Sequence, residues 1–167
     1  HSFWVPKIGY TIELSILEKC LAIGTAFERF ISKGGHRVYH RTDGGLYWKV
    51  FTDFQPTFEV NGIPAQSSTG TSFSLPKKEH VVAAIAILSS DVFWWWYTVT
   101  SNLRHLNPAI WKKFPVPAAA MYDPEIAELG AGYVADLKKN STILIRNQKT
   151  TGRTETQSFK IQKSKPI

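Results

Sequence analysis

The most constraining feature of the sequence is the apolar run VVAAIAILSSDVFWWWYTV at residues 81–99. It is nearly long enough to cross a bilayer as one helix. However, Asp91 lies at its centre, where an acidic side chain costs about 2.5–3.5 kcal/mol in a membrane. Ser89 and Ser90 add polarity there, and the tryptophans lie inside the run rather than at its two ends. We therefore expect a buried helix in the core of a soluble protein, and no membrane partner.

Apolar side chains recur along this run at helical spacing. One predicted face carries Val81, Ile85, Leu88, Val92 and Trp95, and the adjoining face carries Val82, Ala86, Phe93 and Tyr97. Such a wide apolar surface is typical of a helix that is buried on most sides. Residues 101–107, which follow the run, are polar and basic, so we expect this end to face a ligand or solvent.

The composition is typical of one globular domain. The chain has 167 residues, of which 43% are hydrophobic and 20% are charged, and this length falls in the range of single domains. It begins at His1 rather than Met and stops soon after a Lys-Pro pair, so we expect a fragment of a larger protein. Its single cysteine, Cys20, excludes an internal disulfide and favours a reducing, cytoplasmic location.

The positive charge is concentrated at the C-terminal end of the chain. Residues 136–167 carry eight basic and two acidic side chains, a net charge of +6, whereas residues 1–135 carry a net charge of only +1. The sequence therefore predicts a near-neutral core followed by a basic, β-rich extension. A basic segment on a near-neutral body suggests a polyanionic partner, although a solvated tail has the same composition.

Helices and strands are predicted to be segregated along the chain, which indicates an α+β fold with helices packed on small, mostly antiparallel sheets. The predicted helices cover residues 11–32, the apolar run, 108–114 and 124–139. The predicted strands cover 36–41 and 46–51, which form a hairpin around TDGG or two adjacent strands, then 72–75, and the two segments on either side of Thr151-Gly152. The segments at 55–57 and 61–71 are expected to be loops.

No catalytic motif is recognisable in the sequence. NPAI at 107–110 lacks the second proline and the aromatic residue that an amino-methylating enzyme requires. GAG at 130–132 lies inside a helical pattern, whereas a dinucleotide or methyl-donor loop follows a strand. Ser67 and Ser68 have no glycine elbow and no candidate base. We therefore expect this chain to contain no catalytic residues, and neither to methylate nor to cleave DNA by itself.

No metal site is expected either. Asp123, Asp136 and Lys138 have the spacing of a metal-dependent nuclease, but they fall at the two ends of one predicted helix and cannot converge on Mg²⁺. His36 and His40 share a strand face, but no third ligand lies near them. We expect both to be exposed strand histidines rather than metal ligands.

Basic and aromatic residues alternate in the strand HRVYHR at 36–41. A period of two places Arg37, Tyr39 and Arg41 on one face and Val38 on the other. An arginine fork can pair with guanine edges or hold phosphates, and a tyrosine ring offers a stacking surface. The alternative is a solvated strand in which Tyr39 packs on its neighbours.

The small-residue loop at 66–71 is a second candidate for contact with nucleic acid. Hydroxyl groups and backbone N–H groups in such a loop can approach a phosphate backbone closely. The candidate residues are Ser67, Ser68 and Thr69. An ordinary connecting loop has the same composition, so the pattern leaves both interpretations open.

Two further groups of polar and basic residues complete the set of candidates. From the segment after the aromatic run we select Asn102, Arg104, His105 and Asn107, and from the basic extension Lys149 and Arg153. For the first group, helix capping and buried hydrogen bonding are the alternative roles.

Several motifs, taken in order, resemble a known protein family. They are KIGYTIE, HRVYHRTDGGLYWKVFTDFQPTF, SSTGTSF, AILSSDVFWWWYTVTSNLRHLNPAIWKKFPVP and DLKKNSTILIRNQKTTGRTETQSFKIQKSKPI. Together they resemble the TaqI-like C-terminal specificity domain of fused restriction–modification enzymes that carry an N6-adenine DNA methyltransferase. The resemblance covers nearly the whole chain. One departure is Leu88 before Ser89-Ser90, where the family usually has Asn.

The resemblance implies a target-recognition domain that binds double-stranded DNA. It also implies an upstream methyltransferase domain in the same chain, with S-adenosylmethionine as its cofactor, and Mg²⁺ if the parent enzyme also cuts DNA. In the family, the catalytic Asn/Asp-Pro-Pro-aromatic loop lies in that upstream domain, which agrees with its absence here.

Our hypothesis is therefore a sequence-specific DNA recognition domain of a type II restriction–modification enzyme. Two alternatives remain open. One is a protein-interaction module that docks through the aromatic helix, which exposed Trp94 to Trp96 beside an apolar groove would favour. The other is an RNA-binding domain, because aromatic stacking with basic residues also serves single strands.

Overall fold

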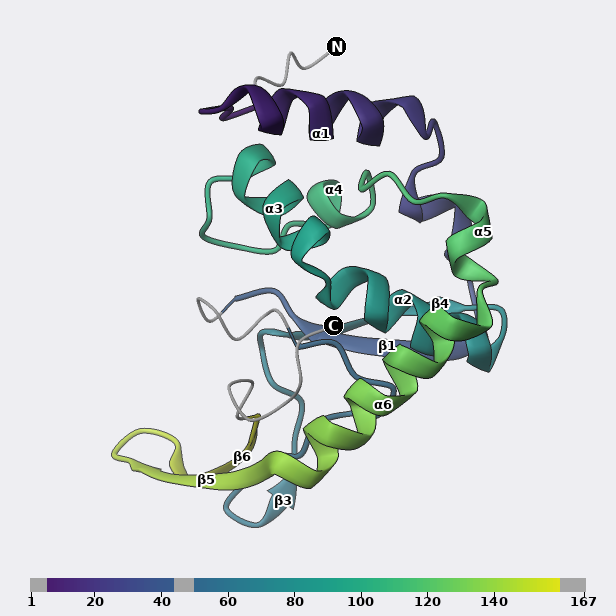
Figure 1. Ribbon diagram of the computed structural model, residues 1–167. Coiled ribbons are helices and arrows are strands. Elements are labelled where there is room, and N and C mark those ends of the chain that lie inside the picture. Colours follow the sequence, from purple (N-terminus) through teal and green to yellow (C-terminus); the bar gives the residue numbers. More distant parts are fainter. Residues whose placement is uncertain (1–5, 44–49, 160–167) are drawn as a thin grey trace.

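The computed structural model describes residues 6–43 and 50–159 (Figure 1). The helices are α1 (Thr11–Ala22), the 3-10 helix η1 (Phe27–Phe30), α2 (Lys78–Ser89), α3 (Asp91–Thr100), α4 (Pro108–Trp111), α5 (Ala118–Met121) and α6 (Pro124–Asn140). The strands are β1 (His36–Arg41), β2 (Phe58–Val60), β3 (Ile63–Pro64), β4 (Gly70–Leu75), β5 (Ser141–Gln148) and β6 (Gly152–Phe159). In this part of the chain, helices pack on two small antiparallel sheets, which confirms the predicted α+β class.

The apolar run forms two helices rather than the single helix that its spacing predicts. The chain is extended at Ser90, and α2 and α3 are bent by 58° across this break. The Ser90 hydroxyl accepts a hydrogen bond from the backbone N–H of Phe93, at 3.2 Å, and so caps α3. Because of the break, α3 does not continue the apolar face of α2. Val92 is therefore 52% exposed, although the sequence places it on that buried face. A local cap therefore overrides the continuous apolar pattern.

Within residues 6–43 and 50–159, no single helix is both long and apolar enough to cross a membrane. Only α2 and α3 taken together meet that test, and they are the bent pair.

The aromatic residues form the centre of the core, between the β1–β4 sheet and helices α3 and α4. Phe73 of β4 stacks on Trp111 of α4, with ring centroids 4.6 Å apart, and Phe27 of η1 packs edge-on against both rings. Phe51 contacts Phe93 of α3 in the same way. Phe93, Trp96 and Tyr97 of the aromatic run are buried in this core, which confirms the expectation that the run is mostly core.

Helices α2 and α6 pack unusually closely at Gly130. A Cβ atom added at Gly130 would lie 1.9 Å from the backbone oxygen of Val82, so only glycine fits at this crossing. The helix itself begins where the sequence predicts: the Asp123 side chain accepts hydrogen bonds from the N–H groups of Glu125 and Ile126, and Pro124 occupies the first turn. The GAG sequence is therefore a packing feature inside α6.

The first sheet pairs two strands that are distant in the sequence. β1 is antiparallel to β4, with Val38 opposite Phe73. The sequence predicts a different partner, 46–51, most of which lies outside the described residues. Val50 and Phe51 are not part of a strand, and Thr52 forms only an isolated β-bridge with Tyr39. The observed partner β4 begins two residues before the predicted strand at 72–75.

The second sheet has the strand order β3-β2-β6-β5. β5 and β6 form the hairpin predicted around Thr151-Gly152, which is confirmed. β2 lies in a region whose flanking segments were predicted to be loops, and it pairs with β6 through Glu59 opposite Glu155. β6 thus pairs with β2 on one edge and with β5 on the other. The described part of the basic segment therefore belongs to the sheet and is not a solvated tail.

Two predicted helices end earlier than expected. The helix predicted at 11–32 stops at Ala22, and Gly24 then adopts a left-handed conformation with φ 69°, after which η1 forms. The helix predicted at 108–114 stops at Trp111. The short helix α5 and the short strand β3 were not predicted at all.

Candidate nucleic-acid interface

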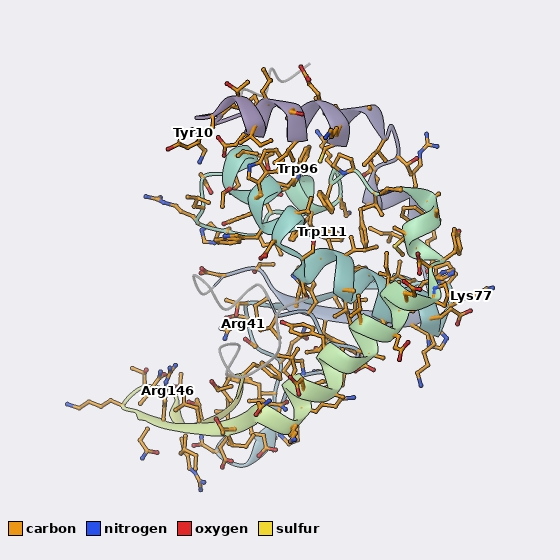
Figure 2. The ribbon with its side chains drawn as sticks, in the orientation of Figure 1. Tyr10, Arg41, Lys77, Trp96, Trp111 and Arg146 are labelled. Atoms are coloured by element: carbon orange, nitrogen blue, oxygen red, sulfur yellow. The ribbon has the colours of Figure 1, made fainter. Side chains whose placement is uncertain are left out.

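An open groove of about 600 Å³ lies between the two sheets. Three arginines line it: Arg37 and Arg41 from β1 and Arg146 from β5. No Asp or Glu is among the described residues that line it, so its fixed charge is positive. Figure 2 shows Arg41 and Arg146 on the same side of the molecule. We call this site the arginine groove.

The alternation predicted for β1 supplies one wall of the arginine groove. Val38 is fully buried, and His40 is buried beside it on the inner face of the strand. Arg37, Tyr39 and Arg41 take the other face and line the groove, which confirms that they share one side. Tyr39 is half-buried and lies between Arg37 and Arg41 along the strand.

Arg41 is held in a fixed orientation by the loop before β4. Its Nε and Nη2 atoms both donate hydrogen bonds to the Thr69 hydroxyl, at 3.1 and 2.9 Å. That hydroxyl is also 3.2 Å from the Ser67 Oγ, and the backbone N–H of Thr42 donates to the Thr69 carbonyl. The structure thus brings together Arg41, Ser67 and Thr69, whereas Ser68 points outward as an exposed turn residue.

The loop between α3 and α4 is attached to the end of β1. The backbone N–H of Leu106 donates to the Thr42 carbonyl at 2.9 Å, and Nδ1 of His105 lies 3.5 Å from a carboxylate oxygen of Asp43. Residues 101–107 therefore lie next to Arg41 in space. Figure 1 shows this loop on the same side of the molecule as the β5–β6 hairpin.

Two of the candidates in this loop have structural roles. The side-chain oxygen of Asn107 accepts from the N–H of Ala109 at 2.9 Å and caps α4. The side-chain oxygen of Asn102 accepts from the N–H of Arg104 at 3.1 Å and shapes the loop. Arg104 itself is exposed, as is His105.

The two candidates from the basic segment lie outside the arginine groove. Lys149 is exposed on the turn between β5 and β6. Arg153 is paired with Glu155 at 2.8 Å. The basic residue that does line the groove is Arg146, which was not selected from the sequence. The signal was present in the alternation of TILIRNQ, because Leu144 and Arg146 share the face that lines the groove.

His40 is a core residue, so the expectation that it is exposed is wrong. It is 4% exposed and packs against the rings of Phe51, Phe73 and Trp111. Burial lowers its pKa from 6.5 to about 4, which keeps the ring neutral at pH 7. Its Nδ1 lies 3.2 Å from the Arg41 carbonyl, to which it donates. His36, in contrast, is exposed as predicted.

The arginine groove is lined by polar hydrogen-bonding groups and by apolar side chains. Guanidinium groups, hydroxyls and the amide side chains of Gln55 and Gln66 line it, and groups of these kinds can bind phosphates and the edges of bases. The Gln157 amide also lines the groove but is already hydrogen-bonded to Thr57 and Ser141. Within the described residues, no group of three or more His, Cys, Asp or Glu side chains is placed to hold a metal ion.

Comparison with protein-family models, with curated proteins and with solved structures found no match to this chain. The resemblance to restriction–modification specificity domains is therefore still a prediction from sequence motifs.

Proposed function

We propose that this chain is a DNA target-recognition domain that holds one side of a duplex in the arginine groove. The observation that carries the proposal is the lining of the groove by Arg37, Arg41 and Arg146, with no carboxylate among its described lining residues. A groove of this charge attracts a polyanion and favours release of counterions from DNA.

The three arginines differ in exposure, which suggests different tasks. Arg37 and Arg146 are exposed and free to follow a phosphate backbone, which sets position without reading sequence. Arg41 is half-buried and fixed by Thr69, so its fork is pre-oriented. A fixed fork can pair with two acceptors on guanine, which a flexible point charge does not imitate.

In this proposal the chain works beside an upstream adenine methyltransferase domain, inside the cytoplasm. That domain would bind S-adenosylmethionine, extrude the target adenine and methylate it. This chain would supply the sequence reading, and it would perform no chemical step.

The test is a selection from a pool of randomised 30-base-pair duplexes, followed by affinity measurements on the selected sequence over a range of salt concentrations. Replacing a phosphate-contacting arginine by alanine should flatten the log–log salt slope by about 0.9. We expect that change for Arg37→Ala and Arg146→Ala, with similar losses of affinity for every sequence. For Arg41→Ala we expect the binding free energy to weaken by about 1–3 kcal/mol on the selected duplex. On duplexes with a single-base change it should weaken little.

Lys77→Ala is the matched control, because Lys77 lies on the opposite side of the molecule in Figure 2. It removes one positive charge without touching the arginine groove, so the salt slope should not change. Equal effects of Lys77→Ala and Arg146→Ala would mean that only net charge matters, and would contradict the proposal. Tighter binding of a single-stranded RNA pool than of duplex DNA would favour the RNA-binding alternative.

Exposed tryptophans would favour the protein-docking alternative, whereas Trp94 and Trp95 are half-buried and Trp96 is buried. Trp96 is 5% exposed, and its indole N–H donates to the Ile110 carbonyl. Trp95 is half-buried and donates to Glu13, and Trp94 stacks on Tyr97 with centroids 5.5 Å apart. The aromatic run is therefore engaged within the chain.

A further inference from the structure

Leu103 has an unusual backbone conformation on the loop beside the arginine groove. Its φ is 63°, in the left-handed region, and among the described residues only Asn61 shares this feature without being glycine. Asparagine tolerates that region because its side chain can hydrogen-bond locally. Leucine has no such compensation, so the conformation of Leu103 is strained.

The strain at Leu103 is imposed by hydrogen bonds on both sides. The Ser101 hydroxyl, which is buried, accepts from the Leu103 N–H at 3.1 Å. The Asn102 side chain accepts from the N–H of the following residue, Arg104, at 3.1 Å. Further along, Leu106 is fully buried and tied to Thr42. These contacts support the loop shape in which residue 103 is left-handed.

The strain at Leu103 is not compensated by burial of its side chain. The Leu103 side chain is 50% exposed, whereas a leucine kept for packing would lie in the core, as Leu106 does. Glycine or asparagine would satisfy the backbone at this position without cost. Residues held in sparsely populated backbone conformations cluster at binding and catalytic sites.

The neighbours of Leu103 are suited to nucleic acid. Arg104 is exposed, and within the described chain no carboxylate lies within ion-pair distance of it. Leu106 joins the loop to Thr42, the residue after Arg41, so Leu103 and Arg104 lie on a loop that is attached to the Arg41 end of β1. Proteins that bend or open a duplex place apolar side chains next to cationic ones in this way.

We propose that Leu103 is a wedge that enters a base step of the bound duplex and separates the stacked bases. This inference rests on the proposed function, because it assumes that duplex DNA lies along the arginine groove. It adds a mechanical role to recognition: the phosphate contacts hold the duplex, and Leu103 unstacks it. Unstacking lowers the cost of extruding a nucleotide or bending the site.

The experiment uses the selected 30-base-pair duplex with 2-aminopurine placed at each adenine position in turn. This analogue is quenched when stacked and brightens when its neighbours move away. The chain should brighten one or two adjacent positions. Leu103→Gly should abolish that increase while keeping affinity within about tenfold, because the phosphate contacts are untouched. Leu103→Asn should behave in the same way.

Thermal melting separates a wedge from a structural residue. Both variants suit a left-handed backbone, so the melting temperature should rise by about 2–4 °C or stay the same, whereas loss of a packing residue lowers it. Arg104→Ala is the companion control: it should flatten the salt slope and leave the brightening in place. Binding without brightening at any position, or brightening that Leu103→Gly retains, would overturn the wedge and leave the proposed function standing. No binding by the unaltered chain would overturn both.

Discussion

Arg41 and Thr69 form a fixed pair at the edge of the arginine groove, because one hydroxyl accepts two hydrogen bonds from one guanidinium group. The two residues are 28 positions apart and are brought together by the pairing of β1 with β4. A guanidinium held at Nε and at one terminal nitrogen keeps its remaining donors directed away from Thr69. This pre-orientation lowers the entropy that Arg41 would lose on binding.

The first prediction concerns this pair. Thr69→Val keeps the shape of the side chain but removes the acceptor, so Arg41 should lose its orientation. We expect about 1 kcal/mol less discrimination, roughly fivefold, between the selected duplex and its best single-base variant. Thr69→Ser restores the hydroxyl and should restore discrimination. Competition binding with the two duplexes measures the ratio directly, and equal ratios for Thr69→Val and the unaltered chain would show that Arg41 needs no support.

The second prediction uses two glycines on one helix. Gly130→Ala places a Cβ against the Val82 carbonyl, so it should destabilise the fold by about 2–3 kcal/mol through overpacking. At Gly132 nothing lies within 4 Å of an added Cβ, and alanine should stabilise the helix by about 0.5–1 kcal/mol. Urea denaturation of both variants measures the free energy of unfolding. A Gly130→Ala variant that is as stable as the unaltered chain, or more stable, would show that α2 and α6 do not approach this closely.

Local signals predicted a good part of the fold. The cap and proline at Asp123-Pro124 mark the start of α6, and alternation with a glycine turn marks β5 and β6. The same alternation placed Arg37, Tyr39 and Arg41 on one side of β1. In each of these cases the determining residues lie within a few positions of one another, so the pattern can be read without knowing the tertiary structure.

Long-range pairing could not be read from the sequence in this way. The pairing of β1 with β4 depends on which strands meet in space, and about thirty residues separate these two along the chain. Arg146 joins the arginine groove only because β6 pairs with β2 and carries β5 along with it. The break at Ser90 was missed for a different reason: one capping hydroxyl outweighs an apolar pattern that continues through it.

The third prediction separates the two roles considered for Asn107. As the cap of α4, its replacement in Asn107→Ala should cost about 1 kcal/mol of stability. Asn107→Asp keeps a capping oxygen and adds a negative charge, so stability should be retained. If Asn107 only caps, affinity for duplex DNA should fall slightly and uniformly as a long-range charge effect. A large loss of affinity in Asn107→Asp with unchanged stability would instead place Asn107 at the DNA, as first predicted from the sequence.

The fourth prediction is a loss of stability in acid that depends on His40. Its pKa is about 4 in the folded chain and 6.5 when unfolded, because burial disfavours the charged ring. Between these values the unfolded chain holds a proton that the folded chain does not, so acidification favours unfolding. Above pH 6.5 both states are neutral and His40 contributes no pH dependence. As the pH falls from 6.5 to about 4, the folded state should lose stability, up to about 3 kcal/mol.

His40→Phe is the variant that tests this assignment, because the site is surrounded by Phe51, Phe73 and Trp111 and accepts an aromatic ring. It removes the titrating group and the hydrogen bond to the Arg41 carbonyl, so its stability at pH 7.5 can differ from that of the unaltered chain. The readout is therefore the slope of the unfolding free energy against pH, measured in urea between about pH 7.5 and pH 4.5.

Other acid-sensitive groups remain in both proteins. Glu13, whose pKa is lowered by hydrogen bonds from the Gly9 and Tyr10 backbone, loses its contribution as the pH falls in either chain. The difference between the two slopes isolates His40, and we expect the variant to be flatter between pH 6.5 and pH 4.5. Parallel slopes would mean that His40 gains a proton without leaving the core, which its aromatic surroundings argue against because they offer no counter-charge.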